Sequence, residues 1–309
     1  MPYLLALISA ACYGANIFCT HAGTRLGKVD SNQVLIINLV SGTLFLSLVE
    51  AGILVKSGLP RISWAGIAFF VASGLGGPFL GRMFSIRSIQ RIGGTRTASL
   101  RMSEIFITIL LAFLILGERI PPIAFLGAAV LLGGILLLVN KKKNPGPTAE
   151  PDRHSPPAGS AAAALSLNPG IVLPFVSALF FAGSRIFSQL GLNEMPSPIL
   201  GALCGTVAAA ISNSLVLAVS GHLKARWQIS PRQLFFFILS GIGGSLGLLL
   251  LMLAMNMGGL VSLVGALKNT SPLFTLMLSW LFLKDVEKID AGLIASILLI
   301  VAGAVLIVL

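Results

Sequence analysis

Six charged residues lie well inside the apolar stretches of this 309-residue sequence, away from their ends. These four cations and two carboxylates are Arg82, Arg101, Arg185, Lys268, Glu50 and Glu104. A charged side chain at the centre of a bilayer costs roughly 2.5 to 3.5 kcal/mol on insertion scales, so each of them needs a partner, a wet cavity or a route to the interface. Because the cations outnumber the carboxylates, their field favours a carboxylate or another anionic group as a ligand.

Three of these residues are expected to form one cluster. At a rise of about 1.5 Å per residue, Arg82 and Glu104 each lie about 12 Å from the same membrane face. Arg101 precedes Glu104 by three positions, which places both side chains on one face of a helix. A lone ionised carboxylate in hydrocarbon is too costly, so we predict that Glu104 faces the protein interior within salt-bridge reach of Arg82 or Arg101.

The other cations are expected near the opposite face. Arg185 and Lys268 lie at matching depths from that face, with Glu50 nearby. Asn16, the counterpart of Arg185 under a shift of 169 positions, would add a neutral donor or acceptor. The sequence thus predicts a charged ring toward each mouth of a central cavity. In the alternative interpretation, these long cations extend along their helices to lipid headgroups.

The composition is that of a membrane protein. Hydrophobic residues make up 56% of the chain and charged residues 10%, with a mean hydropathy of +0.96. Soluble domains usually carry about a quarter charged residues. A water-soluble core could not contain this much apolar sequence, so we expect an all-α polytopic membrane protein.

Ten apolar runs are separated by polar residues, glycine or proline. They cover residues 3–24, 32–55, 64–90, 96–117, 122–139, 170–192, 197–220, 233–256, 260–283 and 290–309. A transmembrane helix needs roughly 20 predominantly apolar residues, so the sequence predicts ten transmembrane helices. Glu118 and Asp285, which follow the fourth and ninth runs, are expected at solvated helix ends.

The two halves of the sequence repeat each other. A shift of 167 positions superimposes SGLGG at 73–77 on SGIGG at 240–244, and Arg101 on Lys268. An odd number of spans in each half makes the two copies antiparallel in the membrane. We therefore predict two inverted five-helix repeats.

A change of composition separates the halves. Residues 140–169 contain three consecutive lysines and six prolines, which is typical of flexible linkers. The predicted domains are a first five-helix repeat at 1–139, a flexible linker at 140–169 and a second five-helix repeat at 170–309.

Loop charge predicts the orientation. Fourteen loop cations follow the odd-numbered spans and three follow the even-numbered spans. Positive residues gather in cytoplasmic loops, so both termini are expected outside the cytoplasm. This distribution also accounts for the net charge of +11, and we predict no nucleic-acid partner.

Motifs of intramembrane enzymes and metal sites do not occur in the sequence. An intramembrane protease or transferase needs paired catalytic groups, such as Gly-x-Gly-Asp or His-Glu-x-x-His. His21, His154 and His222 have no spacing that would bind a metal ion. We predict a protein that is not an enzyme and that has no catalytic residue, metal or cofactor.

Several motifs resemble those of a known family. They are CYGANIF in the first span, GRMFSIRSIQRIGGTRTASLR leading into the fourth, LLAFLILGERI at its end, and glycine-rich fifth and tenth spans. Over nearly the whole chain outside the linker, the sequence resembles the drug/metabolite transporter superfamily in its ten-span EamA-type form. The resemblance implies export or exchange of amino acids, organic acids and other small metabolites through a central cavity.

The sequence departs from the family pattern in three ways. Its first span has no carboxylate, unlike the short multidrug antiporters, which argues against cationic-drug antiport. Its fourth span has Glu104 where many relatives have a proline nearby, whereas the ninth keeps Pro272. Ten-span relatives usually have both termini in the cytoplasm, the opposite of what the loop charge predicts.

The resemblance and the intramembrane charges together imply a secondary transporter for a small, carboxylate-bearing metabolite. It is expected to work as an exporter or exchanger by alternating access, in a bacterial or archaeal inner membrane. Its expected partners are a small-molecule substrate and the lipid bilayer, with proton coupling as an option. A lipid or polyprenyl-phosphate flippase using the same cations is the alternative, and an intramembrane enzyme is a more distant one.

The residues expected to carry this function come from both halves. The predicted substrate-binding residues are Asn16, Arg82, Arg101, Glu104, Arg185 and Lys268. Glu104 and Glu50 are the candidates for binding a coupling proton.

Overall fold

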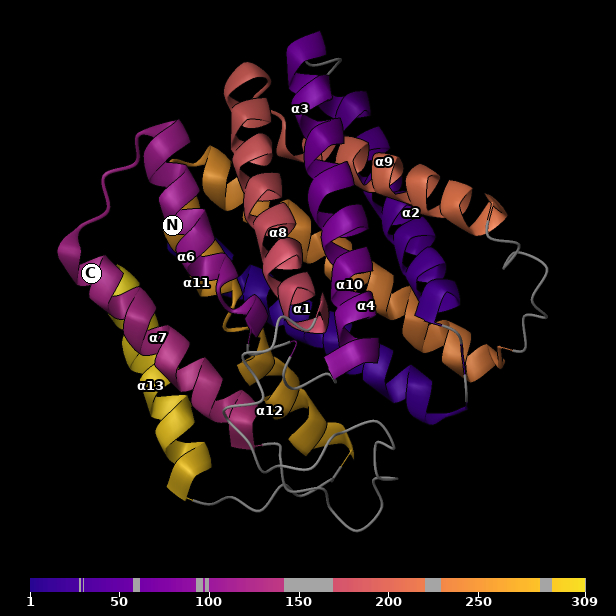
Figure 1. The fold of residues 1–309 in the computed structure, drawn as a ribbon. Helices are drawn as coiled ribbons and strands as arrows, with labels where there is room; N and C mark the ends of the chain where they lie inside the picture. The colour runs from indigo at the N-terminus through magenta and orange to yellow at the C-terminus, as the bar shows by residue number, and fades with distance from the viewer. Residues whose placement is uncertain are drawn as a thin grey trace.

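The computed structural model describes residues 1–27, 29, 31–57, 62–92, 97, 100–141, 169–219, 229–283 and 291–308. This part of the chain forms helices and no strands (Figure 1). The first half contributes α1 (Pro2–Arg25), α2 (Ser31–Ser57), α3 (Trp64–Gly74), η1 (Leu75–Gly81), α4 (Arg82–Ile92), α6 (Glu104–Leu111), η2 (Ala112–Leu116) and α7 (Pro122–Lys141). The second half contributes α8 (Pro169–Glu194), α9 (Pro198–Val219), α10 (Pro231–Asn256), α11 (Val261–Lys268), α12 (Ser271–Leu283) and α13 (Ala291–Val308). The predicted all-α fold is confirmed for the described residues, and residues 142–168 of the predicted linker lie outside them.

Six helices in the described part are long and apolar enough to cross a membrane, as expected of an integral membrane protein. They are Pro2–Arg25, Asn32–Ile53, Trp64–Ser88, Ile171–Glu194, Pro198–Val219 and Pro231–Asn256. Shorter apolar helices lie in the fourth, fifth and tenth predicted runs, at Glu104–Leu116, Pro122–Leu137 and Ala295–Ile307. The ninth run is divided between α11 and α12. The count of ten spans therefore stays a prediction.

The third run is one helical rod with a π-helical segment in its middle. Pro78 lies within this segment, η1. Proline has no N–H to donate to the helix, and the wider π-helical turn accommodates the missing bond. The rod resumes as α4, whose first residue is Arg82.

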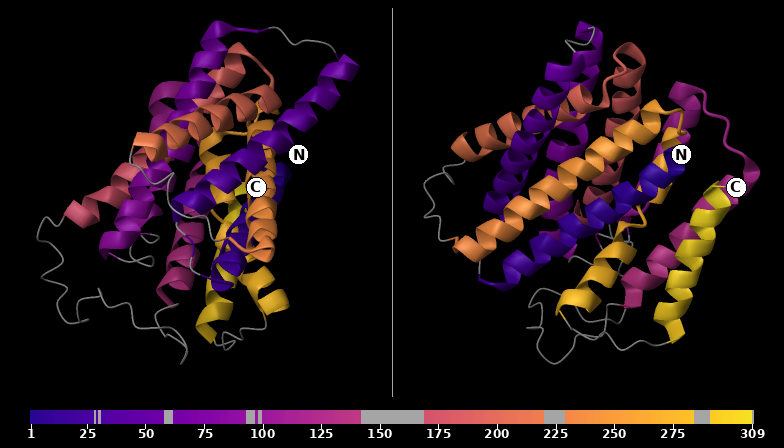
Figure 2. Two further views of the ribbon diagram at one scale, coloured as in Figure 1. Left: turned by 90° about the vertical axis from the view of Figure 1, so that its right-hand side faces the viewer. Right: turned by 180° about the vertical axis from the view of Figure 1, so that it is seen from behind.

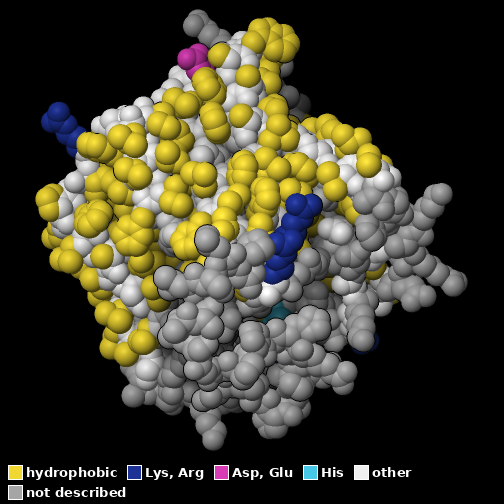
Figure 3. Space-filling view, viewed as in Figure 1, with side chains coloured by type: hydrophobic (Ala, Val, Ile, Leu, Met, Phe, Trp, Pro, Cys, Tyr) yellow, Lys and Arg dark blue, Asp and Glu magenta, His cyan; other side chains and the backbone are white. Residues whose placement is uncertain are grey.

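Hydrophobic side chains cover the outer surface of the described helices. Figure 3 shows them spread over the face in view, with few lysine or arginine side chains between them. Leu48, Phe113 and Trp280 are each more than half exposed. Soluble proteins rarely expose so large a contiguous apolar surface, so this surface fits contact with lipid.

The most extensive helix contacts join the two halves of the chain. α1 packs along α10, α3 and η1 along α8, and α7 along α13. Ser9 bonds to Gly247 near one end of α1, and Gly27 bonds to Gln233 beyond the other, so α1 and α10 are antiparallel. α3 and α10, which form the third and eighth runs, also run in opposite directions (Figures 1 and 2).

The two Ser-Gly-x-Gly-Gly segments make equivalent polar contacts. Nδ2 of Asn16 donates to the main-chain oxygen of Ser240 at 2.6 Å. In the other half, Oγ of Ser184 donates to the main-chain oxygen of Ser73 at 2.8 Å. Asn16 is therefore the counterpart of Ser184 under a shift of 168 positions. The predicted correspondence of Asn16 with Arg185 is wrong by one residue. The residue that bonds to the main-chain oxygen of the serine in each segment is Asn16 in one half and Ser184 in the other.

Glycines in these segments allow the close approach. A Cβ atom on Gly244 would meet Nδ2 of Asn16 at 2.7 Å, and a Cβ atom on Gly77 would meet Oγ of Ser184 at 2.6 Å. Small residues at helix crossings let backbones approach and polar groups bond within a membrane. The same kind of contact, a polar side chain packed against a glycine of the facing helix, therefore joins α1 to α10 and α8 to η1.

Candidate functional site

The fourth and ninth apolar runs are interrupted at matching places in the repeat. A turn at residues 102–103 separates Arg101 from α6, and a turn at 269–270 separates Lys268 from α12. These positions coincide under the shift of 167. Interrupted helices in corresponding segments of two halves are typical of transporter binding sites, because their free main-chain groups line a cavity.

The main-chain bonds of the two turns are also equivalent. The N–H of Ser103 donates to the oxygen of Leu100 at 3.2 Å, and the N–H of Thr270 donates to the oxygen of Leu267 at 3.0 Å. Bonds between residues three apart form tighter turns than those of an α-helix. Each break thus leaves a cation on the last helical turn before it.

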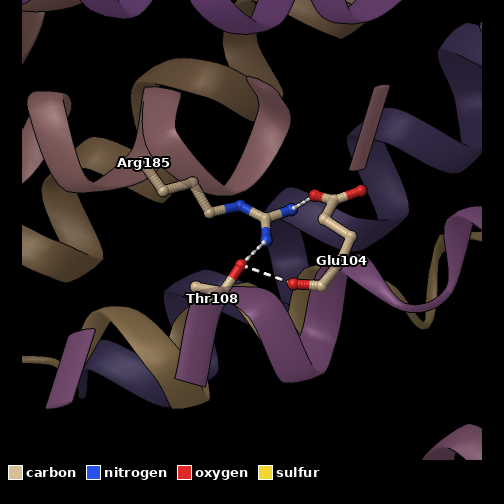
Figure 4. Close-up of polar contacts among 3 residues, drawn as sticks. All are labelled: Glu104, Thr108 and Arg185. Atoms are coloured by element: carbon tan, nitrogen blue, oxygen red, sulfur yellow. Dashed lines mark hydrogen bonds and ion pairs between the residues drawn. The ribbon is translucent and has the colours of Figure 1, made fainter. Parts of the chain in front are cut away.

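An ion pair lies where α6 crosses α8 (Figure 4). Nη2 of Arg185 contacts Oε1 of Glu104, and Nη1 of Arg185 donates to Oγ1 of Thr108 at 3.2 Å. The Thr108 hydroxyl donates in turn to the main-chain oxygen of Glu104 at 2.7 Å. Glu104 is 2% exposed and Arg185 6% exposed, so lipid and solvent reach neither.

The position of Glu104 agrees with the prediction, but its partner does not. Glu104 faces the protein interior and is paired with a cation, as its cost in hydrocarbon requires. In the described part of the chain that cation is Arg185, and the predicted pairing with Arg82 or Arg101 is wrong. The turn at 102–103 interrupts the helix, so a spacing of three residues does not place Arg101 and Glu104 on one helix face.

Arg101 contacts two other side chains. Its Nη1 lies 3.4 Å from Oγ of Ser85, to which it donates. Its guanidinium carbon lies 5.4 Å from the centroid of the Phe181 ring. A cation over an aromatic face is attracted by the ring quadrupole. These contacts place the half-buried Arg101 between α4 and α8.

Lys268 is also held by an aromatic ring. Its Nζ lies 5.0 Å from the centroid of the Tyr13 ring on α1. Lys268 interacts electrostatically with Glu104, Arg185 and Arg101. The helix that carries Lys268, α11, also contacts both α6 and α8, which carry the ion pair.

The two predicted groups of charges form one cluster. Arg101, Arg185 and Lys268 all interact electrostatically with Glu104, and Arg82 interacts with Arg101. We call Arg82, Arg101, Glu104, Arg185 and Lys268 the central charge cluster. The predicted separation of Glu104 from Arg185 is wrong, because the two form an ion pair. Charged rings at the two mouths of a cavity stay a prediction.

Two other predicted residues make contacts with residues outside this cluster. Nδ2 of Asn16 bonds to Ser240 in the contact between α1 and α10. Glu50 is buried on α2 and interacts with Cys204 of α9. The predicted proximity of Glu50 to Arg185 and Lys268 stays a prediction. Roles for Asn16 in substrate binding and for Glu50 in coupling stay predictions.

Sequence reasoning missed Thr108 and Tyr13. The repeat holds a signal for Thr108, because Thr275 occupies the matching position under the shift of 167. Each threonine also bonds across a helix interface, Thr108 to Arg185 of α8 and Thr275 to the main-chain oxygen of Gly14 of α1. For Tyr13 the sequence offers no signal beyond its place in the CYGANIF motif.

Glu118 caps the short helix that carries Lys268. Its carboxylate accepts hydrogen bonds from the main-chain N–H of Val261 at 2.5 Å, the N–H of Ser262 at 3.2 Å and the Ser262 hydroxyl at 2.6 Å. The expectation of a solvated helix end is therefore wrong for Glu118, because free N–H groups at the start of α11 attract a carboxylate. Asp285, its counterpart, lies outside the described residues.

A lateral hollow of about 580 Å³ lies beside Glu118. Apolar side chains of α6, η2 and α7 line most of it, including Ile109, Phe113 and Phe125. Glu118 and the exposed Arg119 are the charged residues of its lining. No member of the central charge cluster belongs to this lining.

Comparison with known proteins identifies the family. The model of the EamA-like transporter family matches residues 1–140 and 168–309. One solved structure, described as "Crystal structure of protein", is similar in fold over 100% of this chain and 98% of that chain, with a TM-score of 0.75 and 18% sequence identity. A comparison with curated proteins gave no significant match. Since the family model covers both halves of the sequence, the chain belongs to the EamA-like transporter family.

Proposed function

We propose that this protein is a secondary transporter that moves a small carboxylate-bearing metabolite, such as an amino acid or an organic acid. The observation that carries this proposal is the buried ion pair of Glu104 and Arg185. The central charge cluster sets four cations against one carboxylate. Uncompensated buried charge is costly, so an anionic ligand would reduce the excess positive charge of this site.

The proposed architecture is ten transmembrane helices in two inverted five-helix repeats. Its support is the equivalence of Asn16 with Ser184 and of the two helix breaks. In such folds the halves rock against each other around a site near the bilayer midplane. The meeting of α6, α8 and α11 at the central charge cluster suits that mechanism of alternating access.

The proposal also includes a direction of transport. Export or exchange of a metabolite is proposed, across a bacterial or archaeal inner membrane with both chain termini outside. Proton coupling would act through Glu104, which belongs to the site, or Glu50, which is buried on α2.

The proposal can be tested in proteoliposomes. We expect purified protein to move at least one of ¹⁴C-labelled acetate, lactate, succinate, glutamate and alanine, measured with and without a pH gradient. Arg185→Gln should abolish this movement, while Arg119→Gln, which removes an exposed cation, should not. Failure of all five compounds to move with correctly folded protein, or full activity of Arg185→Gln, would contradict the proposal.

A lipid or polyprenyl-phosphate flippase is the second candidate. The lateral hollow favours it, because an apolar groove beside Arg119 suits acyl chains with a phosphate headgroup. In that case, Arg119→Gln should slow the movement of fluorescent phospholipid between leaflets, and Arg185→Gln should leave it unchanged. The two candidates thus predict opposite results for the same pair of variants.

A further inference from the structure

Arg185 has both terminal nitrogens engaged by a single helix. Nη2 contacts the Glu104 carboxylate and Nη1 donates to the Thr108 hydroxyl, and both partners belong to α6 (Figure 4). The planar guanidinium group binds one carboxylate with two parallel hydrogen bonds. A substrate carboxylate that binds Arg185 in this way must take the place of Glu104.

Displacement requires another cation for Glu104. A buried carboxylate that loses its partner is strongly destabilising. Lys268 already interacts electrostatically with Glu104. Its ammonium group lies over the Tyr13 ring, and in the described part of the chain no carboxylate forms an ion pair with it. Lys268 can therefore pair with the displaced Glu104 carboxylate while Arg185 pairs with the substrate carboxylate.

We infer that Glu104 is a resident substitute for the substrate carboxylate. In the empty transporter it neutralises Arg185, and the substrate binds by displacing it toward Lys268. This inference rests on the proposed function of carboxylate transport and names the residue that competes with the substrate. It concerns the ion pair itself and requires no change of protonation.

The competition has a consequence for the transport cycle. A site in which Arg185 is neutralised by Glu104 can reorient more readily without substrate, because one cation fewer crosses the membrane interior unpaired. The empty transporter then returns, and net transport proceeds alongside exchange. Without the Glu104 charge, the empty site would carry an unpaired arginine, and only the loaded transporter would reorient readily.

Binding by detergent-purified protein tests the competition. Succinate, lactate and glutamate serve as probes in isothermal titration calorimetry. Glu104→Gln should bind its probe about tenfold more tightly than the unmodified protein, a typical size for coupling between contacting charges. In an Arg185→Gln background the same change should bring no gain. Glu194→Gln, which removes an exposed carboxylate at the end of α8, is the control and should leave affinity unchanged.

Flux measurements test the consequence. Proteoliposomes loaded with the ¹⁴C-labelled probe are diluted into buffer with or without unlabelled probe, to compare exchange with net efflux. Glu104→Gln should retain exchange and lose most net efflux, about tenfold relative to exchange. Glu104→Asp keeps the charge on a shorter side chain, so its ratio of net efflux to exchange should lie between those of the unmodified protein and Glu104→Gln. If Glu104→Gln fails to fold, Glu104→Asp takes its place in the test.

The outcomes separate this inference from the function on which it rests. If the unmodified protein transports a probe but Glu104→Gln binds it no more tightly, the substitute role is refuted and carboxylate transport stands. An equal gain in the Arg185→Gln background also refutes it, because the effect would then be a general one of charge. If none of the probes binds or moves with any variant, the proposed function fails instead.

Discussion

The main-chain nitrogen of Ile300 in α13 lies so close to Gly134 in α7 that a Cβ atom on the glycine would meet it at 2.8 Å. Gly133, the preceding residue, has nothing within 4 Å of its Cβ position. Two adjacent glycines of one helix thus differ fully in surroundings. One of them allows the contact between α7 and α13, and the other faces outward.

This difference predicts opposite effects of the same substitution. Gly134→Ala should lower the free energy of unfolding by about 1 to 3 kcal/mol, the usual cost of overpacking. Gly133→Ala should leave stability unchanged or raise it by up to about 1 kcal/mol, because alanine favours the helix. Thermal unfolding of the two purified variants in detergent measures the comparison. Equal effects would show that α7 and α13 do not pack through Gly134.

The Thr108 hydroxyl is predicted to matter through Arg185. Thr108→Val removes the acceptor of Nη1 and leaves a buried donor unpaired, which should cost about 1 to 3 kcal/mol of stability. Thr206→Val is the matched control, because the Thr206 hydroxyl bonds only to main-chain oxygens of its own helix in the described structure. Chemical denaturation in mild detergent should show a clear loss for the first variant alone.

The cap on α11 can be removed at Glu118. Glu118→Ala takes away the acceptor of three hydrogen bonds and should cost about 0.5 to 2 kcal/mol, as for other helix caps. Since α11 carries Lys268, the variant should also lower the rate of transport. Arg119→Ala, at the neighbouring exposed position, serves as the control. An unchanged melting temperature for Glu118→Ala would mean that the cap does not stabilise α11.

Proton coupling is predicted to depend on the two buried carboxylates. If a pH gradient drives uptake, replacing both Glu104 and Glu50 with glutamine should leave no pH-driven component. Uptake with and without the gradient, measured in the same proteoliposomes, isolates that component. Persistence of pH-driven uptake in the double variant would exclude both residues as proton carriers.

The loop charge predicts both termini outside the cytoplasm. Single cysteines introduced at Met1, Lys142 and Leu309 can be labelled in intact cells with a reagent that does not cross membranes. The terminal positions should react from outside, and position 142 should be protected. The reverse pattern would mean that the positive-inside rule misleads for this chain and that it has the orientation usual for its relatives.

Much of the fold could be predicted from the sequence, because apolar length and punctuation set where membrane helices begin and end. The all-α class and the burial of Glu104 followed from such local rules. The repeat also placed Arg101 and Lys268 at equivalent positions, where the structure has its two helix breaks.

The partners within the site could not be predicted in the same way. The pairing of Glu104 with Arg185 depends on how α6 crosses α8, and spacing along one helix carries no information on a crossing. The break after Arg101 has no proline or glycine to mark it, whereas the break after Lys268 is followed by Pro272. Glu118 was misjudged for a related reason, since its partner, the start of α11, lies 143 positions along the chain.

The pairing of helices from opposite halves has a consequence for how the protein is made. A chain synthesised from its N-terminus delivers α1, α3 and α6 to the membrane before their partners α10 and α8 exist. Glu104 then enters the bilayer some 80 residues before Arg185 leaves the ribosome. The nascent first half must wait, with its carboxylate unsatisfied, in the insertion machinery or at the bilayer interface. Assembly of the site is therefore a late event in biogenesis, because Arg185 arrives with α8 and Lys268 only with α11.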